Sequence, residues 1–379
     1  MNHTLIIGSG FAGSVVAREL ANRGEKVTII EKRNHIGGNC FDEYDEYGVL
    51  VHKYGPHIFH TNNKEVYDYL SQYTSWYDYQ HEVVGNVYGK IIPIPFNLNT
   101  LMIVFGEEKG QQLKKELIEA YGENARVPIL ELQKSESKGI QEVAQYVYEN
   151  IFLKYTMKQW NQKPEEVDQS VTARVPVLLS YDNRYFQDQY QGMPLDGYTK
   201  LFENMLDHEN IEVILNQDAK ALLSFDFDKH EVYYQGQPFD GKIIFTGAID
   251  DFFDYRLGRL PYRSLRFDFE HYDEDDYQGH GVVNYTVSED YTRITEFKHL
   301  TGQQIKGTTI IKEYPQAYVD EKQVPYYAIL SPENKAMHQK YVDLLKPFPQ
   351  FYLLGRLAQY QYYNIDGIVA EALKLAKEI

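Results

Sequence analysis

Three glycines and one carboxylate near the N-terminus have the spacing of a dinucleotide-binding site. Gly8, Gly10 and Gly13 form a turn between an apolar run and a helical pattern, and Glu31 follows the next β-branched run, eighteen residues after Gly13. Such glycines let a pyrophosphate approach the backbone N–H groups at a helix N-terminus, while the carboxylate binds a ribose hydroxyl. Because strand, turn, helix and second strand stand in the right order, the sequence predicts a dinucleotide cofactor.

The residues after Glu31 indicate which dinucleotide binds. Arg33 and the pair Gly37-Gly38 follow at once. A glycine pair alone is more often an ordinary turn after a strand. Here the glycine pair follows a complete fingerprint and forms a second turn without side chains beside an arginine. This combination is more typical of FAD-binding proteins than of NAD sites. We therefore expect FAD.

No protein nucleophile is evident in the sequence. We find no pair of carboxylates placed as in glycosidases and no Ser/His/Asp set. His57 and His60 could be read as metal ligands, but no further ligands with suitable spacing accompany them, and zinc sites need three or four convergent ligands. The sequence therefore predicts no metal site. If the protein catalyses a reaction that needs a nucleophile, the cofactor must supply it.

The composition excludes several classes of partner. The chain has 379 residues with 38 basic and 55 acidic side chains and a net charge of −17, so a broad nucleic-acid or anionic-membrane surface is not expected, and an anionic ligand must be bound by a few arginines. A single cysteine excludes an intramolecular disulfide framework and fits a reducing compartment. With no run that approaches a membrane span and no room for a signal peptide before the first strand, we expect a cytoplasmic protein without membrane insertion.

The elements that position these residues come from both ends of the chain. The first forty residues and the last thirty both read as strand, turn and helix, whereas residues 98–162 have helical apolar spacing and residues 262–314 have strand character. The predicted fold class is α/β, with a discontinuous Rossmann-like FAD-binding domain, an inserted helical domain and an antiparallel β-sheet domain. The expected boundaries are 1–65, 195–250 and 350–379 for the FAD-binding domain, 66–80 and 98–170 for the helical domain, and 81–97, 177–194 and 251–349 for the sheet domain.

Motifs spread along nearly the whole chain resemble those of the UDP-galactopyranose mutase family. The most specific are YGPHIFHTN at residues 54–62 and YTMKQW at residues 155–160, in that order; RNHIGGN, QGMP, GRLPYRSL, YTRITE and GRLAQYQYYNID add to them. The resemblance implies a redox-neutral interconversion of UDP-galactopyranose and UDP-galactofuranose that supplies galactofuranose for cell-surface glycans. It also implies that N5 of reduced FAD acts as the nucleophile on the anomeric carbon with UDP as leaving group, that an external reductant serves the flavin, and that the protein is a homodimer.

The resemblance also implies which residues form the site. Arg174, Arg293 and His60 are the expected catalytic residues, and Arg174 falls in a segment that resembles the family's mobile lid, extending to about residue 176. The expected FAD contacts are Gly8, Gly10, Phe11, Ala12, Gly13, Glu31, Lys32, Arg33, Gly38, Asn39, His57, Ile58, Arg356, Tyr363, Asn364, Asp366, Gly367 and Ile368. The expected substrate contacts are His81, Ile151, Tyr155, Thr156, Trp160, Arg174, Tyr185, Asn284, Arg293, Tyr327, Tyr362 and Asn364.

Two positions depart from the family pattern. Asn364 stands where the family has an acidic residue just after the paired aromatics, and His81 stands where an asparagine is expected. Neither change touches the flavin, and both fit groups that act as hydrogen-bond partners rather than as acid or base.

Two other functions fit parts of the sequence. A flavin-dependent oxidoreductase of amine-oxidase type would share the opening fingerprint but has no evident use for two arginines directed at a diphosphate. An FAD-binding interaction protein could use the 34 tyrosines as a partner surface. Flavin reduction by substrate would identify the first, and UDP binding without turnover the second.

Overall fold

The computed structural model describes residues 3–160, 176–320 and 322–379. Arg174 and most of the segment expected to form a lid lie outside the described residues, as does the side chain of Trp160. No helix in the described part of the chain has the length and apolar character that a bilayer crossing requires.

A five-stranded parallel sheet carries the N-terminal fingerprint. Its strands are β12 (Ile211–Ile214), β2 (Lys26–Ile30), β1 (His3–Ile7), β16 (Ile243–Phe245) and β22 (Phe351–Leu353), in that order. Side chains alternate between the two faces, so Ile6 packs into one core while Leu5 and Ile7 pack into the other. Both faces of the central strands are therefore buried, which explains the apolar runs Leu5–Ile7, Ile29–Ile30 and Ile243–Phe245.

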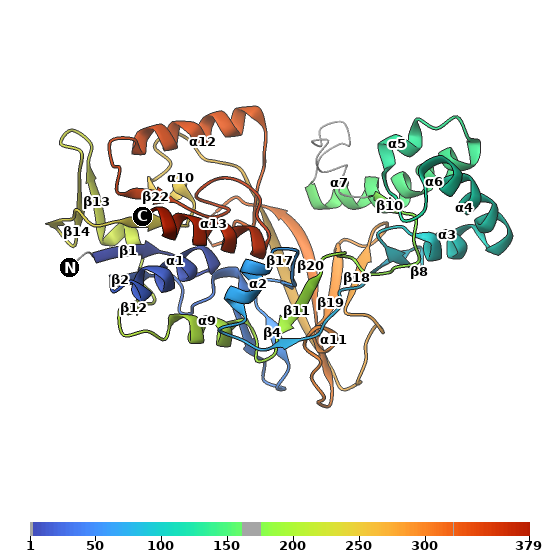
Figure 1. Ribbon diagram of the computed structural model, residues 1–379, viewed down its shortest axis with the longest axis horizontal. Coiled ribbons are helices and arrows are strands. Elements are labelled where there is room, and N and C mark those ends of the chain that lie inside the picture. Colours follow the sequence, from blue (N-terminus) through green and yellow to red (C-terminus); the bar gives the residue numbers. More distant parts are fainter. Residues whose placement is uncertain (1–2, 161–175, 321) are drawn as a thin grey trace.

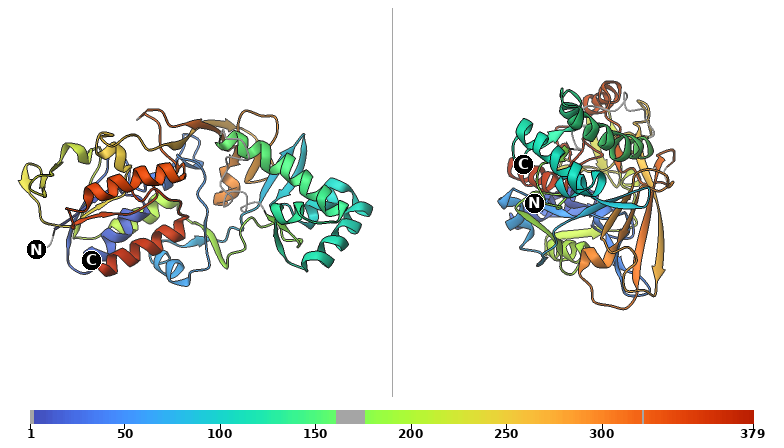
Figure 2. Two further views of the ribbon diagram at one scale, coloured as in Figure 1. Left: turned by 90° about the horizontal axis from the view of Figure 1, so that it is seen from above. Right: turned by 90° about the vertical axis from the view of Figure 1, so that its right-hand side faces the viewer.

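Helices cover both faces of this sheet. The helices α1 (Phe11–Asn22), α9 (Tyr198–Leu206) and α13 (Ile365–Glu378) lie on one face, and α10 (Ile249–Phe252) and α12 (Pro332–Leu345) lie on the other with the small sheet of β13 (Leu223–Asp226), β14 (Glu231–Tyr234) and β15 (Gln237–Pro238). The strands come from both ends of the chain, and the two termini lie at the same end of the molecule (Figures 1 and 2). The predicted discontinuous Rossmann-like fold is confirmed.

A seven-stranded sheet adjoins this layer. In order, its strands are β21 (Tyr327–Ala328), β17 (Tyr262–Tyr272), β20 (Thr308–Ala317), β19 (Arg293–Glu296), β18 (Val282–Tyr285), β7 (Val83–Val87) and β8 (Lys90–Ile94). The sheet is mostly antiparallel, as expected, and its one parallel pairing joins β7 to β18. The strands β7 and β8 form a hairpin from a much earlier segment of the chain. This hairpin pairs with the sheet through β7, which runs parallel to β18.

The helical segment lies at the far end of the molecule from the five-stranded sheet (Figure 1). It consists of α3 (Leu98–Phe105), α4 (Glu107–Tyr121), α5 (Ile129–Gln133), α6 (Lys138–Val147), a π-helical turn η2 (Tyr148–Leu153) and α7 (Lys154–Trp160), with the strand pair β9 (Arg126–Pro128) and β10 (Pro176–Leu178). Leu113, Leu117, Val143 and Val147 are buried in its core, as their helical spacing predicts.

The remaining short elements connect these layers. A three-stranded sheet is formed by β5 (Phe59–Thr61), β11 (Tyr190–Pro194) and β6 (Trp76–Tyr77), and β3 (Asp42–Tyr44) pairs with β4 (Leu50–His52). Short helices are η1 (Gly38–Cys40), α2 (Lys64–Leu70), η4 (Ala219–Ala221) and α11 (Phe297–Thr301). Within residues 66–80, α2 packs on α13 and β6 pairs with β11.

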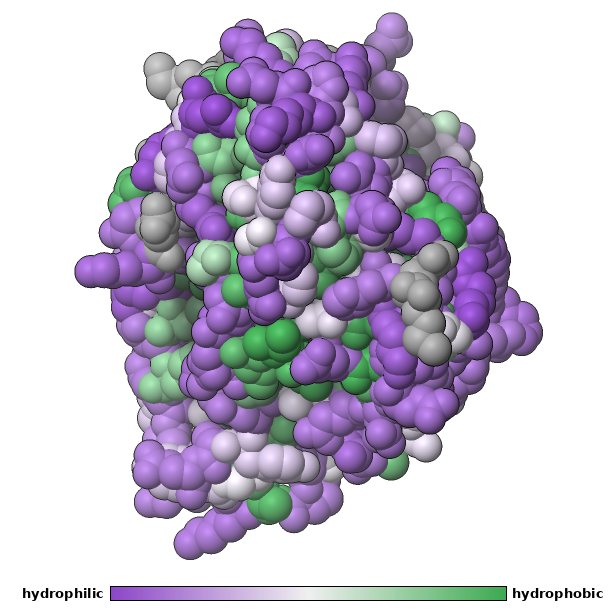
Figure 3. Space-filling view, turned by 90° about the vertical axis from the view of Figure 1, so that its left-hand side faces the viewer, coloured by the Kyte–Doolittle hydropathy of each residue, from purple (hydrophilic) through white to green (hydrophobic). Residues whose placement is uncertain are grey.

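The end of the molecule opposite the helical segment presents a hydrophilic surface. Polar side chains cover most of this face, and apolar side chains form only small, separate patches on it (Figure 3). This matches the excess of acidic side chains in the sequence.

Candidate active site

A cavity lies where the strands β1, β2 and β16 end. Gly8, Gly10, Glu31 and Thr246 follow these strand ends and line it, and the N-terminal residues of α1 and α13 close it. Ligands of open α/β sheets bind at this edge, because the carboxyl ends of the strands and the N-termini of the helices meet there. The predicted FAD contacts that line the cavity are Gly8, Gly10, Phe11, Ala12, Glu31, Lys32, Arg33, Gly38, Asn39, His57, Arg356, Asn364 and Ile368.

Two glycine turns face each other across this cavity. A Cβ atom on Gly10 would lie 3.7 Å from Gly38 Cα, with no other heavy atom of the described chain closer than that. Gly38 has φ +57°, a left-handed conformation that favours glycine. The turns therefore form a cradle of bare backbone, in which a pyrophosphate can reach N–H groups.

Gly13 lies where α1 packs against the end of β1. It does not line the cavity, and a Cβ atom there would lie 2.0 Å from the carbonyl oxygen of Gly8. This glycine therefore permits α1 to pack closely on the end of β1.

Side chains beside the cradle have free hydrogen-bonding positions for the sugar and phosphate groups of a dinucleotide. Glu31 accepts hydrogen bonds from Ser9 N at 3.0 Å, Ser9 Oγ at 2.8 Å and Arg33 N at 3.0 Å. A carboxylate has about four acceptor positions, so one remains for a ribose hydroxyl. Arg33 stacks on Tyr54 and donates to Asn39, while its buried Nη1 has no partner among the described residues. This orphaned donor and the bare cradle fit FAD.

Other expected FAD contacts support the site from outside the cavity. Asp366 accepts a hydrogen bond from Thr61 Oγ1 at 2.9 Å, and the carbonyl of Tyr363 accepts one from Arg356 Nε at 2.7 Å. Asp366, Tyr363, Ile58 and Gly367 do not line the cavity, whereas Arg356 does. They fix the N-terminus of α13, whose free backbone N–H groups and positive dipole end suit a negatively charged ring edge.

A buried ion pair stands next to the cofactor cavity. Arg293 on β19 lies directly opposite Glu313 on β20, and its Nη2 donates to the carboxylate at 3.0 Å. Glu313 is 1% exposed. Burial disfavours both charges and by itself raises the pKa of Glu313, but the carboxylate holds the pKa of Arg293 above its ordinary value. Because arginine keeps its proton at any ordinary pH, we treat the pair as ionised.

This ion pair and its neighbour Asn284 have buried polar atoms without a hydrogen-bond partner among the described residues. Arg293 Nε, Glu313 Oε1 and the Oδ1 atom of Asn284, which is paired with Arg293 across β18 and β19, are buried and have no hydrogen-bond partner among the described residues. Buried polar atoms are normally satisfied, so three together mark a binding site.

Tyrosines surround the ion pair, as expected. Tyr155, Tyr185 and Tyr327 all lie close enough to raise the pKa of Arg293 together with Glu313. Tyr327 stacks on Tyr362 with ring centroids 6.1 Å apart, and the Arg356 guanidinium lies 5.1 Å from the Tyr362 ring centroid. Since Arg356 lines the cofactor cavity, the tyrosine cluster and the cavity adjoin.

The other expected substrate residues differ in exposure and location. Thr156 is 6% exposed beside Tyr155, and Asn364 is exposed at the start of α13. Ile151 is 4% exposed and packs into the core of the helical segment. Arg174 and the Trp160 side chain lie outside the described residues, so the structure does not place them.

The histidines of the site differ in their surroundings. Burial lowers the pKa of His57 and of His81 to about 3, with nearby arginines adding to the effect, so both rings are neutral near pH 7. His57 Nδ1 lies 2.9 Å from the carbonyl of Gly55. His60 does not line the cavity; its Nδ1 pairs with Asp188 Oδ2 at 2.6 Å, and its ring stacks on Phe186.

Comparison with known proteins identifies the family. A family model described as UDP-galactopyranose mutase matches residues 150–362, and one for an NAD(P)-binding Rossmann-like domain matches residues 6–73. The chain is 38% identical over 99% of its length to a probable UDP-galactopyranose mutase of Klebsiella pneumoniae, of which it covers 94%. The chain belongs to the UDP-galactopyranose mutase family. It is also 38% identical over its full length to a dTDP-fucopyranose mutase of Escherichia coli, of which it covers 98%.

Structural comparison agrees with membership of the UDP-galactopyranose mutase family. The crystal structure of a reduced UDP-galactopyranose mutase matches with a TM-score of 0.71 and 14% sequence identity, covering 100% of this chain and 95% of the other. Together with the cradle described above, membership makes FAD the cofactor and isomerisation the reaction class. The alternative of a flavin-dependent oxidoreductase of amine-oxidase type is not supported.

Sequence reasoning missed several residues that line the cofactor cavity or adjoin it. Residues 217–220 after β12 and 246–248 after β16 line the cofactor cavity, with Tyr318 and Pro325. Their position at the ends of predicted parallel strands was a usable signal. Glu313 was also missed, and no local pattern marks it, because its partner lies on a neighbouring strand.

Lowering the pH should destabilise the protein through its buried histidines. His81 has a folded-state pKa of about 3 against an ordinary value of 6.5, so the unfolded chain takes up the extra proton. The stability from the neutral ring is present above pH 6.5 and is lost as the pH falls toward 3. Between pH 7.5 and 5.5 the loss should be about 1.4 kcal/mol for this residue.

Urea unfolding at the two pH values checks this expectation. His81→Asn should lose about 1.4 kcal/mol less than the wild type over that interval, at matched FAD saturation. An unchanged pH dependence in the variant would show that His81 is not held neutral by its burial.

Proposed function

We propose that this protein interconverts UDP-galactopyranose and UDP-galactofuranose. The observation that carries the proposal is the buried Arg293–Glu313 pair, which meets a ring of tyrosines at the edge of the FAD cavity. A partly buried guanidinium whose Nε–H has no partner among the described residues suits a diphosphate, and tyrosine rings with hydroxyl groups suit sugars and bases. Membership of the UDP-galactopyranose mutase family supports a nucleotide sugar as the ligand of these residues.

The protein residues bind and orient in this proposal. The nucleophile toward the anomeric carbon is supplied by bound, reduced FAD. Arg293 stabilises the charge that develops on the departing UDP, and Arg174 is the proposed second cation. Charge-assisted hydrogen bonds contribute about 1.5 to 3 kcal/mol each. Tyr155, Tyr185 and Tyr327 orient the sugar and phosphates around them.

Glu313 and His60 have supporting roles in the proposal. Glu313 lies opposite Arg293 and holds the guanidinium in place. Asp188 fixes the His60 ring through Nδ1, which leaves Nε2 available for a proton or a hydrogen bond. His57 is neutral beside the cofactor cavity and can act as a hydrogen-bond partner without adding charge.

The same proposal extends to the cellular setting. We propose a cytoplasmic homodimer that receives electrons from an external reductant and supplies galactofuranose to cell-surface glycans. The lid around Arg174 would close over the sugar and exclude water.

The test is an assay of the reduced and the oxidised protein with UDP-galactofuranose. The protein is reduced with dithionite under nitrogen, and UDP-galactopyranose is followed by chromatography. We expect turnover in the reduced sample alone, since the flavin is recycled as a nucleophile only when reduced. Turnover in neither sample, with FAD bound, would contradict the proposal.

A second candidate substrate is dTDP-fucopyranose. The specific observation is that the Escherichia coli dTDP-fucopyranose mutase is as similar to this chain, at 38% identity, as the Klebsiella pneumoniae protein. Supplying both nucleotide sugars to the same reduced sample distinguishes them. A kcat/KM at least about tenfold higher for dTDP-fucopyranose would transfer the proposal to that substrate, a difference that one added or missing group can produce.

A further inference from the structure

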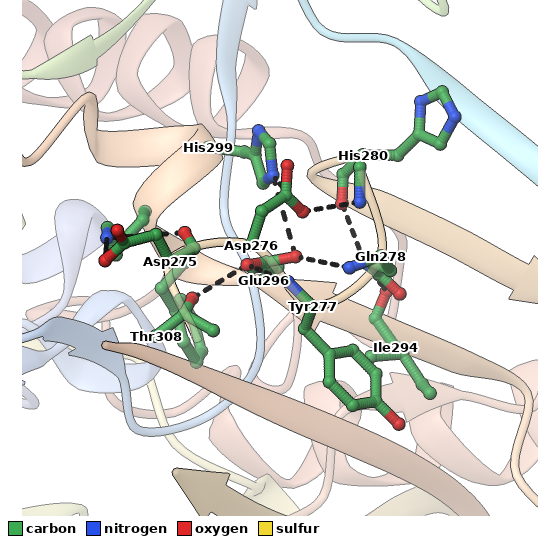
Figure 4. Close-up of polar contacts among 12 residues, drawn as sticks. Asp275, Asp276, Tyr277, Gln278, His280, Ile294, Glu296, His299 and Thr308 are labelled. Atoms are coloured by element: carbon green, nitrogen blue, oxygen red, sulfur yellow. Dashed lines mark hydrogen bonds and ion pairs between the residues drawn. The ribbon is translucent and has the colours of Figure 1, made fainter. Parts of the chain in front are cut away.

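One group of metal-ligating side chains lies outside the active site. Asp276, in the connection between β17 and β18, meets Glu296 at the end of β19 and His299 in α11, and one ligand atom of each lies within 4.8 Å of the others. Figure 4 shows both carboxylates and the imidazole pointing toward one another, while the ring of His280 is turned away. No other such group is found among the described residues.

The ion-pair distances in this group are long and match those between two ligands of one metal ion. His299 Nε2 lies 3.4 Å from Asp276 Oδ1 and 3.6 Å from Glu296 Oε2. Charge-assisted N–H···O bonds close to about 2.7 to 2.9 Å, and the His60–Asp188 pair of this chain does so at 2.6 Å. Ligands bound tetrahedrally at about 2.1 Å lie about 3.4 Å apart, which matches the distances around His299.

Backbone groups hold the two carboxylates in place without occupying them fully. Glu296 Oε2 accepts one hydrogen bond, from Gln278 N at 3.0 Å, and Asp276 Oδ1 accepts one from Gly279 N at 2.6 Å. Glu296 Oε1 accepts from Tyr277 N and Thr308 Oγ1. Each ligand oxygen keeps a lone pair free toward His299, and such supporting bonds orient the ligands of metal sites.

Charge and access also suit a divalent cation. The side chain of Glu296 is 0% exposed, whereas those of Asp276 and His299 are 52% and 32% exposed. The two carboxylates carry two negative charges, which a divalent ion neutralises beside the buried Glu296, and the imidazole binds such an ion in its neutral form. The exposed side leaves an entry path and room for a water as fourth ligand.

We propose that Asp276, Glu296 and His299 form a site for Zn²⁺. One imidazole with two carboxylates suits this borderline ion, whereas Mg²⁺ and Ca²⁺ prefer oxygen ligands alone. The site ties the loop at residues 273–281 to α11. It is separate from the proposed mutase reaction and does not depend on it.

Titration calorimetry of the FAD-loaded protein with ZnCl₂ tests the site. The protein is expressed without a polyhistidine tag and treated with a chelator before use. We expect saturable binding of one Zn²⁺ per chain. Co²⁺ should give tetrahedral d–d absorption at wavelengths beyond the flavin band, and Zn²⁺ should remove it.

Three variants make the test specific. Asp276→Asn keeps an oxygen for Gly279 but loses the charge, and His299→Gln removes the imidazole; each should weaken Zn²⁺ binding at least about tenfold. Asp275→Asn changes the neighbouring acidic side chain, which is not a ligand, and should bind Zn²⁺ like the wild type. All three should keep mutase activity.

Three results would overturn the proposal. These are the absence of one-to-one Zn²⁺ binding, unchanged binding in both Asp276→Asn and His299→Gln, and an equal loss in Asp275→Asn. The last would indicate a diffuse acidic surface in place of three defined ligands.

Discussion

Replacing Arg293 by methionine should remove most of the turnover while the FAD content stays close to that of the wild type. The guanidinium provides charge-assisted hydrogen bonds to the proposed diphosphate, and losing one such bond costs about 1.5 to 3 kcal/mol, or one to two decades in kcat/KM. Arg293 does not line the FAD cavity, so flavin binding should be spared. Kinetics of the reduced enzyme and the flavin-to-protein absorbance ratio measure the two effects.

The variant should also lose stability, because it leaves Glu313 buried and unpaired. Removing one partner of a buried ion pair costs about 3 to 5 kcal/mol. The double variant Arg293→Met/Glu313→Gln removes both charges and should recover much of that stability. It should not recover turnover. If turnover returned with stability, Arg293 would be a structural residue and not a ligand of the substrate.

Arg266 offers a matched control for this experiment. It lies on β17 of the same sheet, separated from β19 by β20, and pairs with Asp268 at the surface, where its side chain is 50% exposed. Arg266→Met should change neither kcat/KM nor stability appreciably, since exposed ion pairs contribute about 1 kcal/mol at most.

Alanine at Gly10 should separate cofactor binding from folding. Gly10 has φ −75°, which alanine adopts freely, and its Cβ would meet the protein only at Gly38 Cα, 3.7 Å away. The methyl group would instead occupy the space of the pyrophosphate. Overpacking by such a group costs about 1 to 3 kcal/mol, so FAD affinity should fall about tenfold to a hundredfold. The melting temperature of the FAD-free protein should not change.

Alanine at Gly13 should give the opposite pattern. Its Cβ would lie 2.0 Å from the Gly8 carbonyl oxygen and 2.9 Å from the side chain of Ile6, so the backbone of α1 would have to shift. We expect a poorly folded protein. Flavin fluorescence titration and thermal melting of both variants check the pair. Wild-type FAD affinity in Gly10→Ala would show that the pyrophosphate lies elsewhere.

The predicted site residues that local sequence brings together at the cavity are those encoded by neighbouring residues. The glycine turn, Glu31 and Arg33 lie within one strand–turn–helix–strand unit, whose geometry follows from local spacing. The same holds for the apolar periodicity of the helical segment. The seven-stranded sheet was less predictable, because its edge hairpin comes from a distant segment and pairs in parallel.

The sequence alone determined the class of cofactor and the Rossmann-like fold, because both depend on short-range patterns of glycine, charge and apolar residues. Only the tertiary structure decided which side chains meet across strands. Glu313 stands opposite Arg293 because β19 and β20 pair in one particular register, and Asp276 reaches Glu296 and His299 because a loop folds back over α11. Such contacts join residues far apart in the chain, and no local spacing records them.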